Sequence, residues 1–167
     1  MKAIKVAVVM GSDSDFPVIA KCLGILKEFN VEYEVFVISA HRTPKRAAQF
    51  ALNAEEEGFG VIIAAAGKAA HLAGVIASYT ILPVIGLPIR SSTLDGLDSL
   101  LSTVQMPKGV PVATVAVDGA ENAGLLAVEM LAISDRSLKT ALFEYRNKIS
   151  KEVEEKDRKI KDEANNL

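Results

Sequence analysis

Short apolar runs alternate along the chain with stretches of helical periodicity. Five of these runs are rich in branched aliphatic residues and have the length of β-strands. The strands are predicted at 4–10, 33–38, 60–65, 83–87 and 112–117. Between them, apolar residues recur at i, i+3, i+4 and i+7, the spacing of a helix with one buried face. This alternation predicts a doubly wound α/β fold, with helices on both faces of a parallel five-stranded sheet.

Polar residues mark where the helices start. The first helix is predicted after Gly11–Asp15, with Ser14 as its N-cap. The second is predicted over 45–57, because Thr43 offers a hydroxyl cap and Pro44 takes the first helical position, where no N–H is lost. Further helices are predicted up to about 79, over 94–103 and through 123–130.

From Asp135 onward the pattern is helical and highly charged, with a thin apolar line along one side. The line consists of Leu138, Leu142, Tyr145, Ile149, Val153 and Ile160. One interpretation is a solvated helix stabilised by i, i+4 ion pairs, and the other is a helix that contacts a neighbouring subunit. The chain is expected to form a single α/β domain over 1–167, with a core at 1–134 and this tail at 135–167.

Composition narrows the classes of protein. Half of the residues are hydrophobic, only 5% are aromatic and there is no Trp, so the core must be built from aliphatic side chains, as in a buried parallel sheet. The net charge is −2 and no basic run stands apart from acidic neighbours, so no nucleic-acid partner is expected. No apolar run reaches the roughly 18 residues of a membrane span, so no membrane partner is expected either.

The N-terminal residues and the single cysteine bear on cellular location and redox chemistry. The N-terminus enters a predicted strand at once and leaves no room for a signal peptide, so the protein is predicted to be cytoplasmic. The single cysteine, Cys22, falls in the apolar stripe of the first helix and is expected to be a core residue.

The candidate chemistry lies in the turns that follow the strands, where open α/β sheets bind ligands. The turn from Ser39 to Pro44 carries a hydroxyl, an imidazole (His41) and a guanidinium (Arg42) just before a helix N-terminus. Both histidines of the chain, His41 and His71, fall in such turns. One histidine alone is usually structural, but two in the same layer, beside Arg42, indicate a functional cleft with a proton carrier.

The turn after the first strand offers a second set of polar groups. Ser12 and Ser14 precede a helix and could bind phosphate, whereas Asp15 either accepts hydrogen bonds from a ribose diol or stabilises its own helix N-terminus. After the third strand, alanines and Gly67 would leave room for a planar ring against the backbone. Two histidines without a Cys or Glu cluster do not make a catalytic zinc site, and the loops lack aromatics to stack on a flavin. A site without cofactor or metal, for a phosphorylated small molecule, is predicted.

Several motifs together have a more specific meaning. They are Gly11-Ser-x-Ser-Asp15, Ser39-Ala-His-Arg-Thr-Pro44, Ala69-Ala-His-Leu72, Gly96-Leu-Asp-Ser-Leu100 and Gln105-Met-Pro-x-Gly109. In this order, over roughly 6–131, the chain resembles the N5-carboxyaminoimidazole ribonucleotide mutase family, the PurE enzymes (class I) of bacterial purine synthesis. The resemblance implies a flavodoxin-like three-layer αβα sandwich assembled as a homo-octamer.

The resemblance also implies a reaction and a role for each matching position. The family moves a carboxylate from the exocyclic nitrogen of an aminoimidazole ribonucleotide to ring carbon C4, an isomerisation that needs no cofactor. His41 would be the general acid/base. The residues implied to hold the phosphoribosyl group are Ser12, Asp15, Ser39 and Arg42, and those implied to line the ring and carboxylate pocket are Gly67, Lys68, His71 and Leu72.

The chain departs from the family pattern in the third turn. The family usually reads Gly-Ala-Gly-Gly-Ala-Ala-His-Leu-Pro-Gly, where this chain has Ala65, Lys68 and Ala73 at the first Gly, the third Gly and the Pro. Lys68 could pair with the migrating carboxylate, but the expectation is that it points to solvent.

Two alternatives are weighed against the mutase. Carboxylases that add carbon dioxide directly to aminoimidazole ribonucleotide usually carry Lys after the strand-two His and Arg-Ser-Asn in the third loop. This chain has Arg42 and Lys68-Ala-Ala-His71, which favours the mutase. A non-catalytic nucleotide-binding module would explain Ser12, Asp15 and Arg42 but gives no reason for His41.

Overall fold

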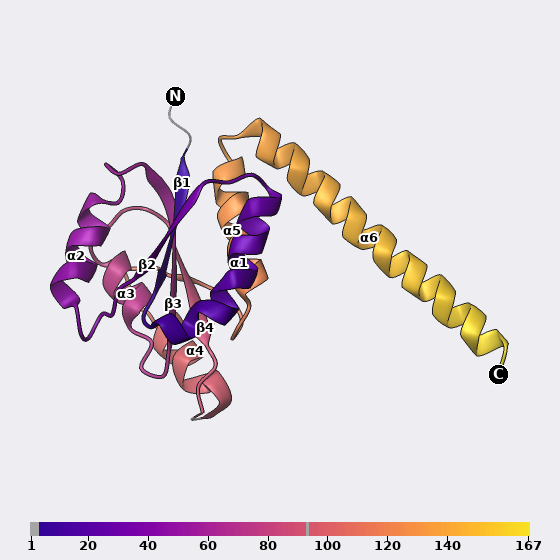
Figure 1. Cartoon of the computed structure of the whole chain (residues 1–167), viewed down its shortest axis with the longest axis horizontal. Helices are drawn as coiled ribbons and strands as arrows, with labels where there is room; N and C mark the ends of the chain where they lie inside the picture. The colour runs from indigo at the N-terminus through magenta and orange to yellow at the C-terminus, as the bar shows by residue number, and fades with distance from the viewer. Residues whose placement is uncertain (1–3, 93) are drawn as a thin grey trace. The chain divides into compact units, whose positions relative to one another are not determined.

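The computed structural model describes residues 4–92 and 94–167 and contains a parallel five-stranded sheet (Figure 1). The strands are β1 (Lys5–Met10), β2 (Tyr33–Val37), β3 (Phe59–Gly67), β4 (Val84–Ile89) and β5 (Ala113–Thr114). Their order across the sheet is β2-β1-β3-β4-β5. This is the flavodoxin-like order, in which the chain reverses direction across the sheet between β1 and β3. The predicted fold class is confirmed.

Helices cover both faces of the sheet. The helical segments are η1 (Asp13–Asp15), α1 (Phe16–Glu28), α2 (Pro44–Asn53), α3 (Leu72–Ala77), η2 (Leu94–Gly96), α4 (Leu97–Val104), α5 (Ala120–Ala132) and α6 (Arg136–Asn165). Figure 1 shows α1 and α5 together on one face and α2, α3 and α4 on the other. On the first face the helices are so close that a Cβ on Gly124 would lie 3.0 Å from the backbone oxygen of Cys22.

The hydroxyl caps differ from the prediction. Ser14 is not the cap of α1. The capping hydroxyl is that of Ser12, whose Oγ accepts a hydrogen bond from the backbone N–H of Ser14 at the start of η1, the short helix before α1. Thr43 does stand at the N-cap position of α2, but its hydroxyl donates to the backbone oxygen of Ser39 at 2.9 Å rather than capping the helix. Thr43 therefore closes the turn after β2 instead of satisfying the helix N–H groups.

Several boundaries also shift. The helix predicted over 45–57 ends at Asn53, because the N–H of Phe59 donates to the oxygen of Ala54 and turns the chain into β3. The helix predicted over 94–103 starts only at Leu97, because Asp95 has a left-handed φ of 53° that interrupts it.

The edge strand β5 is much shorter than the predicted 112–117. The N–H of Val115 donates to the oxygen of Gly86 at 3.1 Å. The next rung of this parallel ladder would need an N–H from Pro88, and proline has none. The ladder between β4 and β5 therefore stops after two residues.

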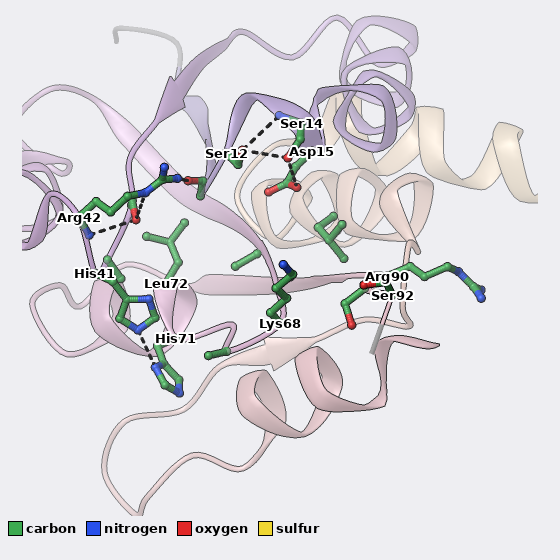
Figure 2. Close-up of a pocket in the computed structure, with 18 residues that line it drawn as sticks. Ser12, Ser14, Asp15, His41, Arg42, Lys68, His71, Leu72, Arg90 and Ser92 are labelled. Atoms are coloured by element: carbon green, nitrogen blue, oxygen red, sulfur yellow. Dashed lines mark hydrogen bonds between the residues drawn. The ribbon is translucent and has the colours of Figure 1, made fainter. Parts of the chain in front are cut away.

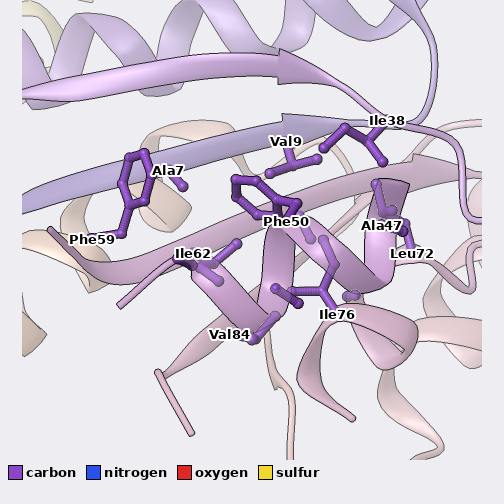
Figure 3. Packing of buried hydrophobic residues seen from close by; sticks show 14 residues of the cluster. Ala7, Val9, Ile38, Ala47, Phe50, Phe59, Ile62, Leu72, Ile76 and Val84 are labelled. Carbon is purple, nitrogen blue, oxygen red and sulfur yellow. The ribbon is translucent and has the colours of Figure 1, made fainter. Parts of the chain in front are cut away.

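The core is aliphatic, as the composition predicts, with one aromatic cluster. On the face covered by α2 and α3, buried residues from three strands interlock with the two helices (Figure 3). Phe36, Phe50 and Phe59 pack against one another, with ring centroids 5.0, 5.9 and 6.1 Å apart. On the other face Cys22 is completely buried, so the prediction that it is a core residue is confirmed.

The chain divides into two compact units, residues 1–131 and 132–167. The second unit contains the predicted long C-terminal helix, α6, which starts where the carboxylate of Asp135 accepts hydrogen bonds from the N–H groups of Ser137 and Leu138. A hydrogen bond from the Ser137 hydroxyl at 2.6 Å, together with these two, lowers the pKa of Asp135. Within residues 4–92 and 94–167, no helix is both long enough and apolar enough to cross a membrane.

Candidate active site

A cavity of about 640 Å³ lies where the first four strands end (Figure 2). β3 and β4 each run two residues further than predicted, to Gly67 and Ile89, and both of these residues line the cavity. All ten residues predicted for the site also line it: Ser12, Ser14, Asp15, Ser39, His41, Arg42, Gly67, Lys68, His71 and Leu72. The structure therefore brings together side chains that lie up to 60 positions apart in the sequence.

The turn after β1 contributes a small hydroxyl cluster. The Oγ of Ser14 donates to the Oγ of Ser12 at 2.8 Å and lies 3.4 Å from a carboxylate oxygen of Asp15. Asp15 is only 8% exposed, and this burial raises the pKa of its carboxyl group. Ser12 and Ser14 face the cavity as donors or acceptors, while Asp15 presents a carboxylate that burial makes easier to protonate.

The turn after β2 fixes a guanidinium at the cavity wall. The Oγ of Ser39 accepts hydrogen bonds from the backbone N–H of Arg42 at 3.2 Å and from its Nε at 3.4 Å. The Nη2 of Arg42 donates to the backbone oxygen of Gly11 at 3.3 Å, which ties the β2 turn to the β1 turn. Both partners, the Ser39 hydroxyl and the Gly11 backbone oxygen, are neutral, so the positive charge of Arg42 remains available to an anion.

The two histidines meet across the cavity wall. The Nε2 of His41 and the Nδ1 of His71 are 2.9 Å apart, and the ring planes stand at 80° to each other. At that distance one nitrogen donates and the other accepts, so each ring determines the tautomer of the other. The pair can therefore hold or pass on a proton at the edge of the cavity.

The turn after β3 combines small residues with one cation. A Cβ on Gly67 would lie 3.3 Å from the backbone oxygen of Ile89, so a larger residue there would crowd the end of β4. Lys68 has a left-handed backbone, with φ of 56°. Its side chain is exposed, as expected, yet it also lines the cavity and extends into it rather than only into bulk solvent (Figure 2).

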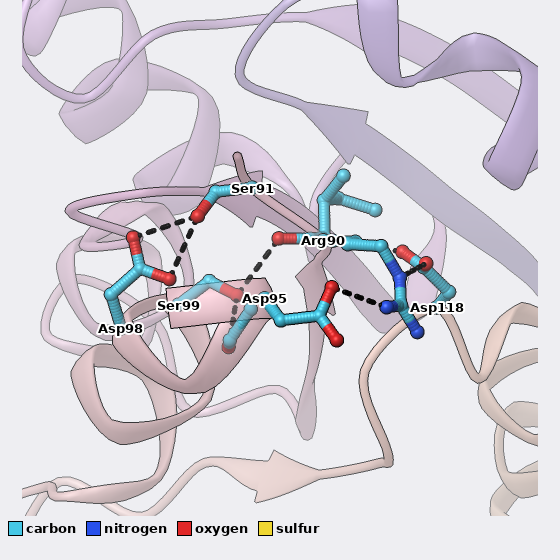
Figure 4. A network of polar contacts seen from close by, with 8 residues as sticks. Arg90, Ser91, Asp95, Asp98, Ser99 and Asp118 are labelled. Atoms are coloured by element: carbon cyan, nitrogen blue, oxygen red, sulfur yellow. Dashed lines mark hydrogen bonds and ion pairs between the residues drawn. The ribbon is translucent and has the colours of Figure 1, made fainter. Parts of the chain in front are cut away.

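The turn after β4 also contributes to the cavity, although none of its residues was predicted as a site residue. Arg90, Ser91 and Ser92 line the cavity, and the signal that could have identified them is their place directly after the fourth strand. Arg90 forms ion pairs with Asp95 and Asp118, and its backbone N–H donates to Asp118 at 2.9 Å (Figure 4). The hydrogen bonds that Arg90 donates to the carboxylates of Asp95 and Asp118 raise the pKa of Arg90.

Metal chemistry was not expected at this site. Within the described part of the chain, no three His, Cys, Asp or Glu side chains gather closely enough to hold a metal ion.

These features define a class: a flavodoxin-like α/β protein with a small-molecule cavity at the carboxyl ends of its strands, lined by serines, an arginine and a histidine pair. The sequence family agrees with this class. The family model described as AIR carboxylase matches residues 5–152, so the chain belongs to the AIR carboxylase family.

Curated relatives extend over nearly the whole chain. The N5-carboxyaminoimidazole ribonucleotide mutase of Pyrococcus horikoshii is 56% identical over 157 residues, which are 94% of this chain and 89% of that protein. The enzyme of the same name from Thermotoga maritima is 53% identical over 93% of this chain and 91% of its own length. The chloroplastic phosphoribosylaminoimidazole carboxylase of Vigna aconitifolia is 57% identical over 82% of this chain, but the match covers only 25% of that longer protein.

The fold has a close counterpart among solved structures. Treponema denticola PurE superposes with a TM-score of 0.83 at 27% identity, covering 92% of this chain and 96% of that one.

Proposed function

We propose that this protein is an N5-carboxyaminoimidazole ribonucleotide mutase, an isomerase of purine (IMP) biosynthesis that forms 4-carboxyaminoimidazole ribonucleotide. The similarity to mutases along almost the whole of both chains supports this assignment. The structural observation that carries it is the His41–His71 pair, which lies in the same cavity as an arginine whose hydrogen-bond partners are neutral.

The first part of the proposal concerns the phosphoribosyl group. Arg42 would bind the phosphate, since a guanidinium held by Ser39 and Gly11 is preorganised and has no competing carboxylate partner among the residues that the structure describes. Ser12, Ser14 and Ser39 would add hydroxyl groups, and Asp15 would accept hydrogen bonds from the ribose hydroxyls.

The second part concerns the ring. Gly67 and the neighbouring alanines leave space for the aminoimidazole against the backbone, and Leu72 supplies an apolar contact at the start of α3. In the reaction, the bond between the exocyclic nitrogen and the carboxyl carbon breaks, and a bond from that carbon to C4 forms. One proton leaves C4 and one is added to the nitrogen, so a single group that gives and takes a proton is sufficient.

We assign that proton transfer to His41. An imidazole with a reference pKa of about 6.5 exists in both forms near neutral pH. The hydrogen bond to His71 fixes the orientation of the ring, and His71 also lines the pocket beside Lys68. His41 and His71 are the two histidines of the chain, and both line the pocket.

The assignment is tested with two substrates, in the presence of a chelator and without ATP. Purified protein should convert N5-carboxyaminoimidazole ribonucleotide rapidly and aminoimidazole ribonucleotide plus bicarbonate slowly, with the C4-carboxylated product followed by NMR. A preference for the second substrate would indicate a direct carboxylase instead. The His41→Asn variant should lose turnover while it keeps its affinity for nucleotide. Unchanged turnover in that variant would contradict the role of His41, and no turnover by the parent protein would leave a nucleotide-binding module.

The family resemblance also leads us to propose a cytoplasmic homo-octamer. Within the first unit, exposed apolar side chains such as Ile81, Leu97 and Leu101 give surface that association could bury. Light scattering coupled to gel filtration would give the mass, and a monomeric mass at micromolar concentration would rule the octamer out.

A further inference from the structure

The three cationic side chains of the cavity differ in whether a carboxylate is paired with them. Arg90 is paired with both Asp95 and Asp118, whereas Arg42 is held by a hydroxyl and a backbone oxygen. For Lys68, the described residues place no carboxylate oxygen within ion-pair distance of the Nζ atom. The cavity therefore contains two cations whose charge is available to a ligand.

These two cations come from turns that follow different strands. Arg42 follows β2 and Lys68 follows β3, and β1 lies between these strands in the sheet. Two inter-strand spacings of about 4.8 Å separate their strands by roughly 10 Å. Figure 2 shows the two side chains reaching the cavity from different places, with Leu72 near the region between them. A ligand with two separate anionic groups suits this arrangement, because one group can bind at Arg42 and the other at Lys68.

The backbone at Lys68 gives a second, independent reason to look at this side chain. A left-handed φ of 56° is unfavourable for a residue with a Cβ, by roughly 1–2 kcal/mol, and glycine adopts it freely. The turn would therefore form more easily without a side chain. Lysine at this position places a cation in the cavity against the local backbone preference.

We propose that Lys68 is a specificity-determining residue whose ammonium group binds the carboxylate of the carboxylated nucleotide. The proposal rests on the function proposed above, in which Arg42 takes the phosphate at the other end of the same ligand. The carboxylate moves between two neighbouring atoms during the reaction, the exocyclic nitrogen and C4. A lysine on a flexible stem can follow it, whereas a guanidinium fixed by Ser39 and Gly11 cannot. Lys68 thereby favours carboxylated over non-carboxylated nucleotide.

The test is a binding comparison by calorimetry with two nucleotides that differ only in the carboxylate. The ligands are 4-carboxyaminoimidazole ribonucleotide and aminoimidazole ribonucleotide, each titrated into the parent protein, Lys68→Asn and Lys68→Arg. Asparagine tolerates the left-handed backbone but carries no charge, and arginine keeps the charge, so the pair separates charge from conformation. Lys68→Asn should weaken binding of the carboxylated nucleotide roughly fivefold to thirtyfold, and leave the other ligand within about twofold. Lys68→Arg should restore most of the difference.

The possible outcomes distinguish a failure of this proposal from a failure of the proposed mutase function. If Lys68→Asn weakens both nucleotides equally, or neither, Lys68 does not recognise the carboxylate and the proposal is overturned. If the parent protein binds neither nucleotide, the proposed function itself is wrong. Thermal melting supplies the folding control: Lys68→Gly should melt above the parent protein because it relieves the left-handed backbone.

Discussion

The Nε2 of His41 and the Nδ1 of His71 stand 2.9 Å apart, with the ring of one edge-on to the other. If both rings were fully protonated, neither nitrogen could accept and the hydrogen bond would be lost. The contact therefore holds at most one extra proton for the two rings. It also leaves the Nδ1 of His41 and the Nε2 of His71 for other partners.

His71→Ala should lower kcat about tenfold and change KM much less, because His41 loses the hydrogen bond that orients its ring. His71→Gln keeps a donor and an acceptor at the same position and should recover part of the loss. Steady-state kinetics of both variants on the carboxyamino substrate provide the measurement. Equal rates in His71→Ala and the parent protein would mean that the histidine contact does not contribute to proton transfer.

Asp15 makes stability depend on pH in a defined direction. Burial raises the pKa of Asp15 from 3.8 in the folded protein, so the folded state binds this proton more tightly than the unfolded state. Its contribution to stability is then present below pH 3.8 and is lost as the pH rises through the raised pKa.

The Asp15→Asn variant should therefore gain in Tm over the parent protein as the pH rises, since asparagine has no carboxylate to desolvate. Melting curves at pH 4.5 and pH 7.5 measure this gain, with Asp162→Asn, at an exposed position on α6, as the control. A gain in Tm that is larger at pH 4.5 than at pH 7.5 would contradict the predicted direction of the pH dependence. The Asp15→Asn variant should also bind nucleotide more weakly, because its amide presents one acceptor oxygen to the ribose instead of two.

Two glycine-to-alanine substitutions should have opposite effects on stability. A Cβ on Gly86 in β4 would lie 2.3 Å from the Cγ2 of Thr103 and 2.9 Å from a methyl of Val112, so Gly86→Ala should destabilise by about 1–3 kcal/mol. A Cβ on Gly24 in α1 would meet nothing within 4 Å, so Gly24→Ala should stabilise by about 0.5–1 kcal/mol. Urea unfolding of the two variants and the parent provides the comparison. A stable Gly86→Ala protein would show that α4 can move away from the sheet.

The thiol of Cys22 should not react in the folded protein. It is completely buried, and burial raises its pKa to about 12. With Ellman's reagent at pH 8, the native protein should give almost no signal, whereas the protein in guanidinium chloride should titrate one thiol. Fast labelling of native protein would reveal local opening of α1 from the sheet.

The local pattern was sufficient to predict the sheet and most of the cavity residues, whereas Lys68 and Leu72 were predicted only from the family resemblance. The apolar runs of β2 and β3 are followed by the turns that contain His41 and His71. Because the carboxyl ends of parallel strands lie at the same edge of a sheet, these turns must lie close together. The place of Arg90 in the cavity could have been predicted by the same rule, because it directly follows β4. Its ion pairs with Asp95 and Asp118 could not, because both aspartates reach it from left-handed backbone that the sequence pattern does not indicate.

Other differences arise where one segment decides the structure of another. The length of β5 is set by Pro88, a residue on the neighbouring strand, and not by the apolar run that predicted 112–117. The hydroxyl of Thr43 had two possible uses, and its hydrogen bonds to the backbone of Ser39 were decided by the close return of the chain after β2. Patterns within one element do not contain this information.

The short β5 has a consequence for how the sheet meets other chains. A long, flat edge strand exposes a row of unpaired N–H and C=O groups on which a foreign strand can grow. Here the row is only Ala113–Thr114, and the proline opposite its end prevents it from lengthening. The sheet thus has, on this side, almost no template for amyloid-like strand addition.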